Sequence, residues 1–79
     1  MSHSEPEGGF GVALFHSVQG AIAAEKLLIG AGVEHKLIPV PRHLSSDCGF
    51  CVRFRWADRE IVEGVLAAAR LGVERIVAL

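Results

Sequence analysis

Two segments of the chain repeat one pattern, and this repeat constrains the fold more than any other feature. The segments "LLIGAGVEHKLIPV" (27–40) and "AAARLGVERIVAL" (67–79) each pass from an apolar helix, through Gly-Val-Glu and a basic residue, into an apolar strand. A short apolar strand precedes each helix, so the order of elements is βαββαβ. This order predicts an α+β fold of the ferredoxin-like type, a split βαβ arrangement with a four-stranded antiparallel sheet and two helices on one face. A small doubly wound sheet is the alternative, although that architecture normally has more strands.

The apolar periodicity gives bounds for these elements. We expect strands at 10–16, 33–40, 50–55 and 73–79 and helices at 18–32 and 56–72. Ser17 is expected to cap the first helix and Gly32 to end it, and Asp58 and Gly72 have these roles in the second helix. The first nine residues offer nothing to bury, which predicts a disordered tail at 1–9 before a single domain at 10–79.

Each helix carries an apolar stripe, which predicts the face that it buries. The stripes consist of Val18, Ala21, Ile22, Ala24, Leu28 and Ile29 in the first helix and Ile61, Val65, Leu66 and Ala69 in the second. The strand "FCVRFR" alternates, so Cys51, Arg53 and Arg55 are expected on the sheet face without helices, together with Gly11, Ala13 and Phe15 or their alternates. A partly apolar open face favours dimerisation or a protein partner.

Charge and hydropathy exclude several classes of function. The net charge is −1, and no apolar run approaches the roughly 20 residues that cross a bilayer. The polar, acidic N-terminus lacks the pattern of a signal peptide, so we expect a cytoplasmic protein without membrane association. Arg53 and Arg55 could bind a phosphate, but Asp47 and Asp58 offset the nearby cations, and we expect no binding to nucleic acid.

The stretch "PVPRHLSSDCGFCVRFR" (39–55) holds both cysteines of the chain. In a thioredoxin-like protein a C-x-x-C motif begins a helix, where the helix dipole stabilises a thiolate. Here the motif enters a strand, which argues against that chemistry. Residues three apart on an extended strand point to opposite faces about 10 Å apart, so only a tight turn at 45–49 would bring Cys48 back to Cys51.

Cys48 is the candidate functional thiol of this stretch. Nearby cations stabilise a thiolate, and the chain supplies Arg42, His43 and Arg53. The hydroxyls of Ser45 and Ser46 and the amide of Gly49 can donate to an anion or to sulfur, whereas Asp47 opposes the thiolate. Gly49 would allow a close backbone approach or a positive φ. Cys51 is either a resolving thiol or a small core residue, as buried cysteines often are.

The segment "KLIPVPRHLSSDCG" (36–49) resembles the signature of the selenium/sulfur carrier-like family, long catalogued as a domain of unknown function. The signature, P-x-P-R-x-[IL]-S-S-x-C-G, is matched at Pro39, Pro41, Arg42, Leu44, Ser45, Ser46, Cys48 and Gly49. The first strand, the "AEKLL" helix, the Gly-Val turn and the "VRF" strand agree too, so the resemblance covers nearly all of 10–79. It implies a small cytoplasmic domain whose loop cysteine carries sulfur or selenium. Cys51 departs from the family pattern, in which an aliphatic residue is usual, so the resemblance does not imply a dithiol mechanism.

Three functions remain open at this point. The first is a sulfur or selenium carrier that exchanges its cargo with protein donors and acceptors. Its expected site consists of Cys48 and Cys51 as thiols and of Pro41, Arg42, Ser45, Ser46, Gly49 and Arg53 as binding residues. The second is a non-enzymatic interaction or regulatory module with incidental cysteines. The third, a metal site of Cys48, Cys51 and His43, has a weak signal because a second ligand pair is missing from the motif. We expect no cofactor and no metal, and a carrier or binding module rather than a stand-alone enzyme.

Overall fold

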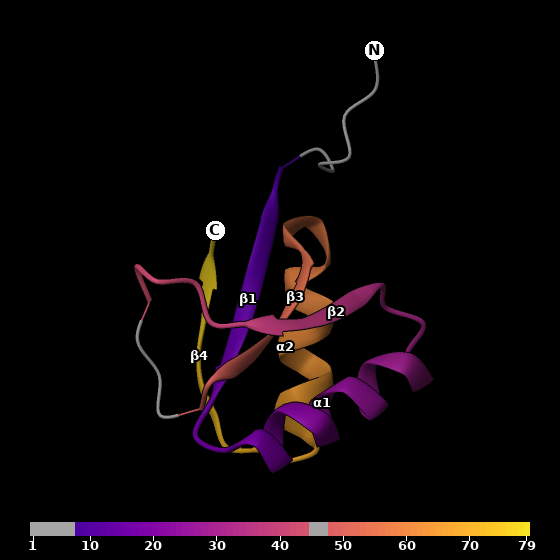
Figure 1. The fold of residues 1–79 in the computed structure, drawn as a ribbon. Helices are drawn as coiled ribbons and strands as arrows, with labels where there is room; N and C mark the ends of the chain where they lie inside the picture. The colour runs from indigo at the N-terminus through magenta and orange to yellow at the C-terminus, as the bar shows by residue number, and fades with distance from the viewer. Residues whose placement is uncertain (1–7, 45–47) are drawn as a thin grey trace.

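The computed structural model describes residues 8–44 and 48–79 and confirms the ferredoxin-like fold (Figure 1). Its elements follow the order β1 (Phe10–Phe15), α1 (Val18–Gly30), β2 (His35–Pro39), β3 (Phe50–Arg55), a 3-10 turn η1 (Trp56–Asp58), α2 (Arg59–Ala68) and β4 (Val73–Ala78). Of the expected tail at 1–9, all but Gly8 and Gly9 lies outside the described residues. The division into a tail and one domain therefore stays a prediction.

The sheet has the strand order β2-β3-β1-β4, and its three strand pairs are all antiparallel. This pairing rules out the doubly wound alternative, whose strands run parallel. Both helices pack on one face, so the other face carries no helix. Figure 1 shows the chain leaving β2 toward the side of the sheet where β4 lies.

The main core lies between the sheet and the helices. It consists of Ala13, Phe15, Ala21, Ala24, Leu28, Val33, Val52, Phe54, Val62 and Leu66. The strand residues of this core alternate along β1 and β3, as expected for a half-covered sheet. Gly11 belongs to the same face and has no room for a side chain, because a Cβ there would collide with the ring of Trp56.

The ends of α1 agree with the sequence. The hydroxyl of Ser17 accepts a hydrogen bond from the amide of Gly20 at 3.3 Å, which confirms the predicted N-cap. Gly32 follows the C-cap residue, Ala31, with a φ of +74°. This left-handed conformation explains why a glycine ends the helix.

The ends of α2 differ from the prediction. The chain first forms η1. Asp58 is the N-cap residue of α2, as predicted, but its side chain makes no cap hydrogen bond, and its carboxylate lies 3.4 Å from Nε of Arg55. At the other end the helix stops at Ala68, and Arg70 rather than Gly72 takes the left-handed conformation, with a φ of +57°.

The predicted stripes on the helices are also partly wrong. Val18, Ile22, Ile29 and Ile61 are 42%, 42%, 66% and 53% exposed, and Ala69 is exposed as well. The buried positions are Ala21, Ala24 and Leu28 of α1 and Val62 and Leu66 of α2. Counting apolar residues failed here because α1 turns its small alanines toward the sheet, where they permit close packing, and leaves larger side chains outside.

None of the helices in the described part of the chain is long and apolar enough to span a membrane.

Candidate functional site

The connection between β2 and β3 folds back over the open face of the sheet. The amide of Val40 donates to the carbonyl of Gly49 at 3.1 Å, and the amide of Leu44 donates to the carbonyl of Pro41 at 3.0 Å. Val40 and Leu44 then pack against Val12, Leu14 and Cys51. We call these five residues the open-face cluster. The connection therefore covers apolar surface that the sequence had assigned to a dimer or partner, and dimerisation stays a prediction.

Cys51 is a core residue of this cluster. It lies opposite Leu14 on β1 and Ile38 on β2, and it is 0% exposed. Burial and, after it, the negative charge of a Cys48 thiolate raise the pKa of Cys51 from 9.0 to about 11. Cys51 is therefore a neutral thiol at physiological pH, and only a thiolate is a strong nucleophile.

Cys48 lies at the base of the connection, directly before Gly49 and β3. It is 4% exposed, and the amide of Phe50 donates to its Sγ at 3.4 Å. The motif enters a strand rather than a helix, which confirms that it is not arranged as in thioredoxin.

The other expected residues of the site are only partly described. Arg42 and His43 are exposed on the connection. Ser45 and Ser46, like Asp47, lie outside the described residues. The positive φ expected of Gly49 is wrong, since its φ is not positive, and among the described residues a Cβ there would meet nothing within 4 Å. A close approach of its backbone to a bound anion stays a prediction. What Gly49 contributes is the carbonyl that closes the connection on Val40.

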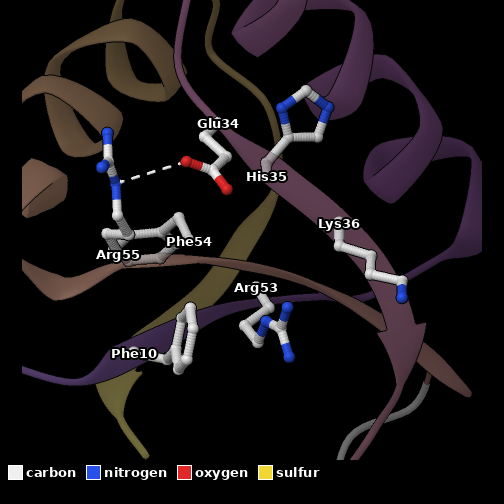
Figure 2. A pocket seen from close by; sticks show the side chains of 7 residues that line it. All are labelled: Phe10, Glu34, His35, Lys36, Arg53, Phe54 and Arg55. Atoms are coloured by element: carbon white, nitrogen blue, oxygen red, sulfur yellow. Dashed lines mark ion pairs between the residues drawn. The ribbon is translucent and has the colours of Figure 1, made fainter. Parts of the chain in front are cut away.

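Arg53 belongs to a second feature of the open face, a pocket of about 120 Å³ (Figure 2). Its guanidinium lies 4.3 Å from the centre of the Phe10 ring. The pocket is lined by Phe10, Glu34, His35, Lys36, Arg53, Phe54 and Arg55, and we call it the basic pocket. Sequence reasoning missed Phe10 and Lys36, because only the strand register shows that Lys36 lies opposite Arg53.

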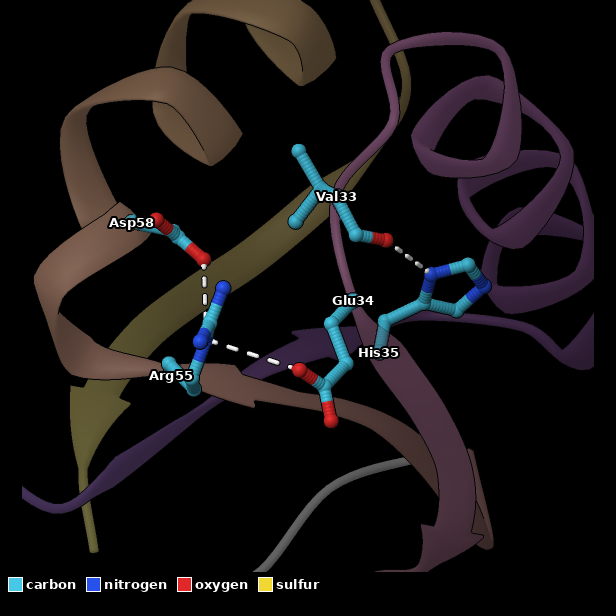
Figure 3. Close-up of polar contacts among 5 residues, drawn as sticks. All are labelled: Val33, Glu34, His35, Arg55 and Asp58. Carbon is cyan, nitrogen blue, oxygen red and sulfur yellow. Dashed lines mark hydrogen bonds and ion pairs between the residues drawn. The ribbon is translucent and has the colours of Figure 1, made fainter. Parts of the chain in front are cut away.

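One side of the basic pocket is held by ion pairs (Figure 3). Nε of Arg55 lies 3.7 Å from Oε1 of Glu34 and 3.4 Å from Oδ2 of Asp58. The neighbouring His35 is fixed by a 2.8 Å contact between its Nδ1 and the carbonyl of Val33. The arginine of this side therefore has two carboxylates at short range.

The three candidate metal ligands of the weakest hypothesis, Cys48, Cys51 and His43, do not form a cluster. Within residues 8–44 and 48–79, no group of three or more His, Cys, Asp or Glu side chains gathers around a common point. The third hypothesis of the sequence analysis is therefore not supported by the described geometry.

Comparison with known proteins identifies the family. Residues 10–78 match the family described as "Putative Se/S carrier protein-like". The chain belongs to this family. It is also 34% identical over 53 residues to "Uncharacterized protein YtiA" of Escherichia coli strain K12, and this region covers 67% of the chain and 62% of that protein. The chain thus spans less than two thirds of the length of this relative, and no solved structure matches significantly.

Proposed function

We propose that this domain carries sulfur or selenium between a donor and an acceptor protein in the cytoplasm, with Cys48 as the attachment site. The observation that supports this most is the setting of Cys48. It is the cysteine of the segment that resembles the family signature, and its Sγ accepts a hydrogen bond from the amide of Phe50. A backbone N–H aimed at sulfur stabilises negative charge there, both on a thiolate and on a bound persulfide.

The transfer step follows ordinary thiol exchange. The Cys48 thiolate attacks the outer sulfur of a donor persulfide, R–S–SH, and a new S–S bond forms on Cys48 as the donor's S–S bond breaks. The donor leaves as a thiolate and takes up the proton that Cys48 released. The reverse chemistry, with an acceptor thiolate, unloads the domain. Selenium would follow the same steps from a donor R–S–SeH.

Because Cys48 is buried, sulfur transfer to and from it should depend on the docking of a partner protein. Thiol exchange requires access to sulfur, and Cys48 is only 4% exposed. A persulfide at this position would be shielded from small thiols in solution. Loading and release would then require a protein that docks on the connection, where Pro41 and the exposed Arg42 are available for contact.

At neutral pH Cys51 is expected to react only slowly with a persulfide on Cys48. As a resolving thiol it would attack the inner sulfur of the Cys48 persulfide, form the Cys48–Cys51 disulfide and release hydrogen sulfide. Because burial raises the pKa of Cys51 to about 11, its thiolate is scarce at pH 7, and this loss of cargo is expected to be slow. Release of sulfide should therefore accelerate with rising pH, and Cys51→Ala should abolish that acceleration.

The experiment that tests the proposal is sulfur transfer followed by intact mass. The chain is incubated with a charged cysteine desulfurase and, separately, with glutathione persulfide. With the desulfurase we expect a gain of one sulfur atom in the wild type and in Cys51→Ala, and none in Cys48→Ser. With glutathione persulfide we expect little or no gain in any variant, because Cys48 is buried. If the wild type gains no sulfur while a known carrier does under the same conditions, the proposal is wrong.

The same burial favours a second function, a non-enzymatic interaction module in which the cysteines serve only packing. Both thiols are inside the molecule, at 4% and 0% exposure, as a structural role requires. Replacement of both cysteines by serine distinguishes the two functions. A partner that still binds the double variant with unchanged affinity supports the interaction module, and loss of binding counts against it.

A further inference from the structure

In the basic pocket two positively charged side chains lie directly opposite each other on neighbouring strands. Lys36 of β2 and Arg53 of β3 are direct partners in the antiparallel register. Side chains in such a pair stand about 5 Å apart at Cβ, and like charges at that distance destabilise the sheet. Within the described part of the chain, neither cation has a carboxylate in ion-pair range.

The adjacent position shows that this arrangement is not forced by the fold. One step away along the same face, Arg55 is matched by Glu34 and by Asp58 at 3.7 and 3.4 Å. The sheet thus pairs one arginine with acids and leaves the next arginine facing a lysine (Figure 2). An unbalanced pair of cations beside a hollow is the arrangement expected where a bound anion supplies the missing charge.

The ring of Phe10 holds one of these cations in place. The guanidinium of Arg53 lies 4.3 Å from the ring centre, a cation–π distance. Stacking uses the flat face of a guanidinium and leaves its N–H edge able to donate. Arg53 is therefore already oriented, so little side-chain entropy remains to be lost on binding an anion.

The size of the hollow limits the ligand. A volume of about 120 Å³ is smaller than the pockets of about 300–1,000 Å³ that bind drug-sized ligands. A pocket of this size favours a single phosphate or carboxylate group as the ligand.

We propose that the basic pocket is an oxyanion site, in which Lys36 and Arg53 bind a phosphate or carboxylate group between them. No cysteine is among the residues that line the pocket, and its lysine and arginine bind the anion without a thiol. The proposal therefore does not depend on sulfur transfer. Its ligand is either a free inorganic anion or the carboxylate of another molecule, and the two chemistries are compared directly.

The test is an NMR titration of the backbone amides at constant ionic strength, with phosphate in one arm, acetate in the second and chloride as the reference. We expect saturable shifts at the amides of Lys36 and Arg53 with at least one oxyanion, with a dissociation constant on the order of 1 mM. Saturation by phosphate alone identifies a phosphate-type ligand, and saturation by acetate identifies a carboxylate. Absence of saturation with both overturns the proposal.

Variants separate a site from general attraction to positive charge. Lys36→Gln should weaken binding about tenfold, and Lys36→Arg should largely retain it. Lys26→Gln is the matched control, because Lys26 is an exposed lysine on α1, outside the pocket. If Lys26→Gln weakens binding as much as Lys36→Gln, the anion senses only net charge, and the proposal is wrong. Unshifted amides in the main core show that each variant remains folded.

Discussion

The open face of the sheet has two ends with opposite character. At one end the open-face cluster is dry, with Leu14 and Cys51 at 0% exposure. At the other end the basic pocket is open and charged. The two ends are neighbours on β3, since Cys51 and Arg53 are separated by one intervening residue and point to the same side.

The difference between these ends comes from what covers them. The connection between β2 and β3 places Val40 and Leu44 on the cluster, so apolar side chains there are removed from water. The described part of this connection does not line the basic pocket, where the strands present cations and one aromatic ring. Strand alternation alone thus defines a face, but a long connection decides which part of that face becomes core.

The largest expected effect is the loss of stability when a side chain is truncated in the open-face cluster, compared with a truncation at the basic pocket. Leu14→Ala should lower the free energy of unfolding by about 3 kcal/mol, because it leaves a cavity under the connection. Phe10→Ala should cost only about 1 kcal/mol, because Phe10 is half-buried at the open end. Urea denaturation of the two variants measures both values. Equal costs would mean that the connection does not make the cluster a true core.

The next largest effect is a dependence of the free energy of unfolding on pH, and it comes from Cys51 in the open-face cluster. The pKa of Cys51 is raised from 9.0 to about 11 in the folded protein, so between these values the unfolded chain loses a proton that the folded chain keeps. Stability from this source is complete below pH 9, falls as the pH rises toward 11, and changes no further above that. The loss should stay below about 3 kcal/mol, at about 1.4 kcal/mol for each pKa unit.

Cys51→Ala is the matched control for this pH dependence. The variant loses some packing at every pH, but its stability should fall less steeply between pH 9 and 11 than that of the wild type. Denaturant unfolding at a series of pH values gives both slopes. Identical slopes would show that Cys51 does not titrate abnormally, and they would remove the explanation given for slow loss of cargo.

Much of the fold was accessible from the sequence because it depends on local signals. The βαββαβ order, the alternation of β3 and the roles of Ser17 and Gly32 each follow from a short pattern, and the structure confirms them. The failures concern choices that depend on contacts between distant segments. Ile22 and Ile61 are apolar at helical spacing, yet packing against the sheet selected smaller or neighbouring residues.

The site was predictable to a lesser extent for the same reason. Cys48 and its connection stand out as a motif, but its burial depends on how the connection folds over the sheet. Lys36 and Arg53 are 17 positions apart in the numbering, and they become partners only through the register of β2 and β3. Local patterns predict neither contact.

The smallest expected effect is a gain of stability at the charged end. Lys36→Glu would replace the like-charged pair with an attractive one opposite Arg53, so the free energy of unfolding should rise by about 0.5 kcal/mol at low salt. The gain should shrink at 1 M salt, because salt screens exposed charges. Lys36→Gln separates relief of repulsion from new attraction and should fall between wild type and Lys36→Glu.

The acidic position one step away supplies the opposite change. Glu34→Lys would remove a carboxylate 3.7 Å from Arg55 and should lower stability by a similar amount, since Asp58 still faces that arginine. Denaturation of both variants at low and high salt measures these small differences. If Lys36→Glu brings no gain at low salt, Lys36 and Arg53 do not repel each other in the free protein. The basic pocket would then have no excess charge for an oxyanion to neutralise.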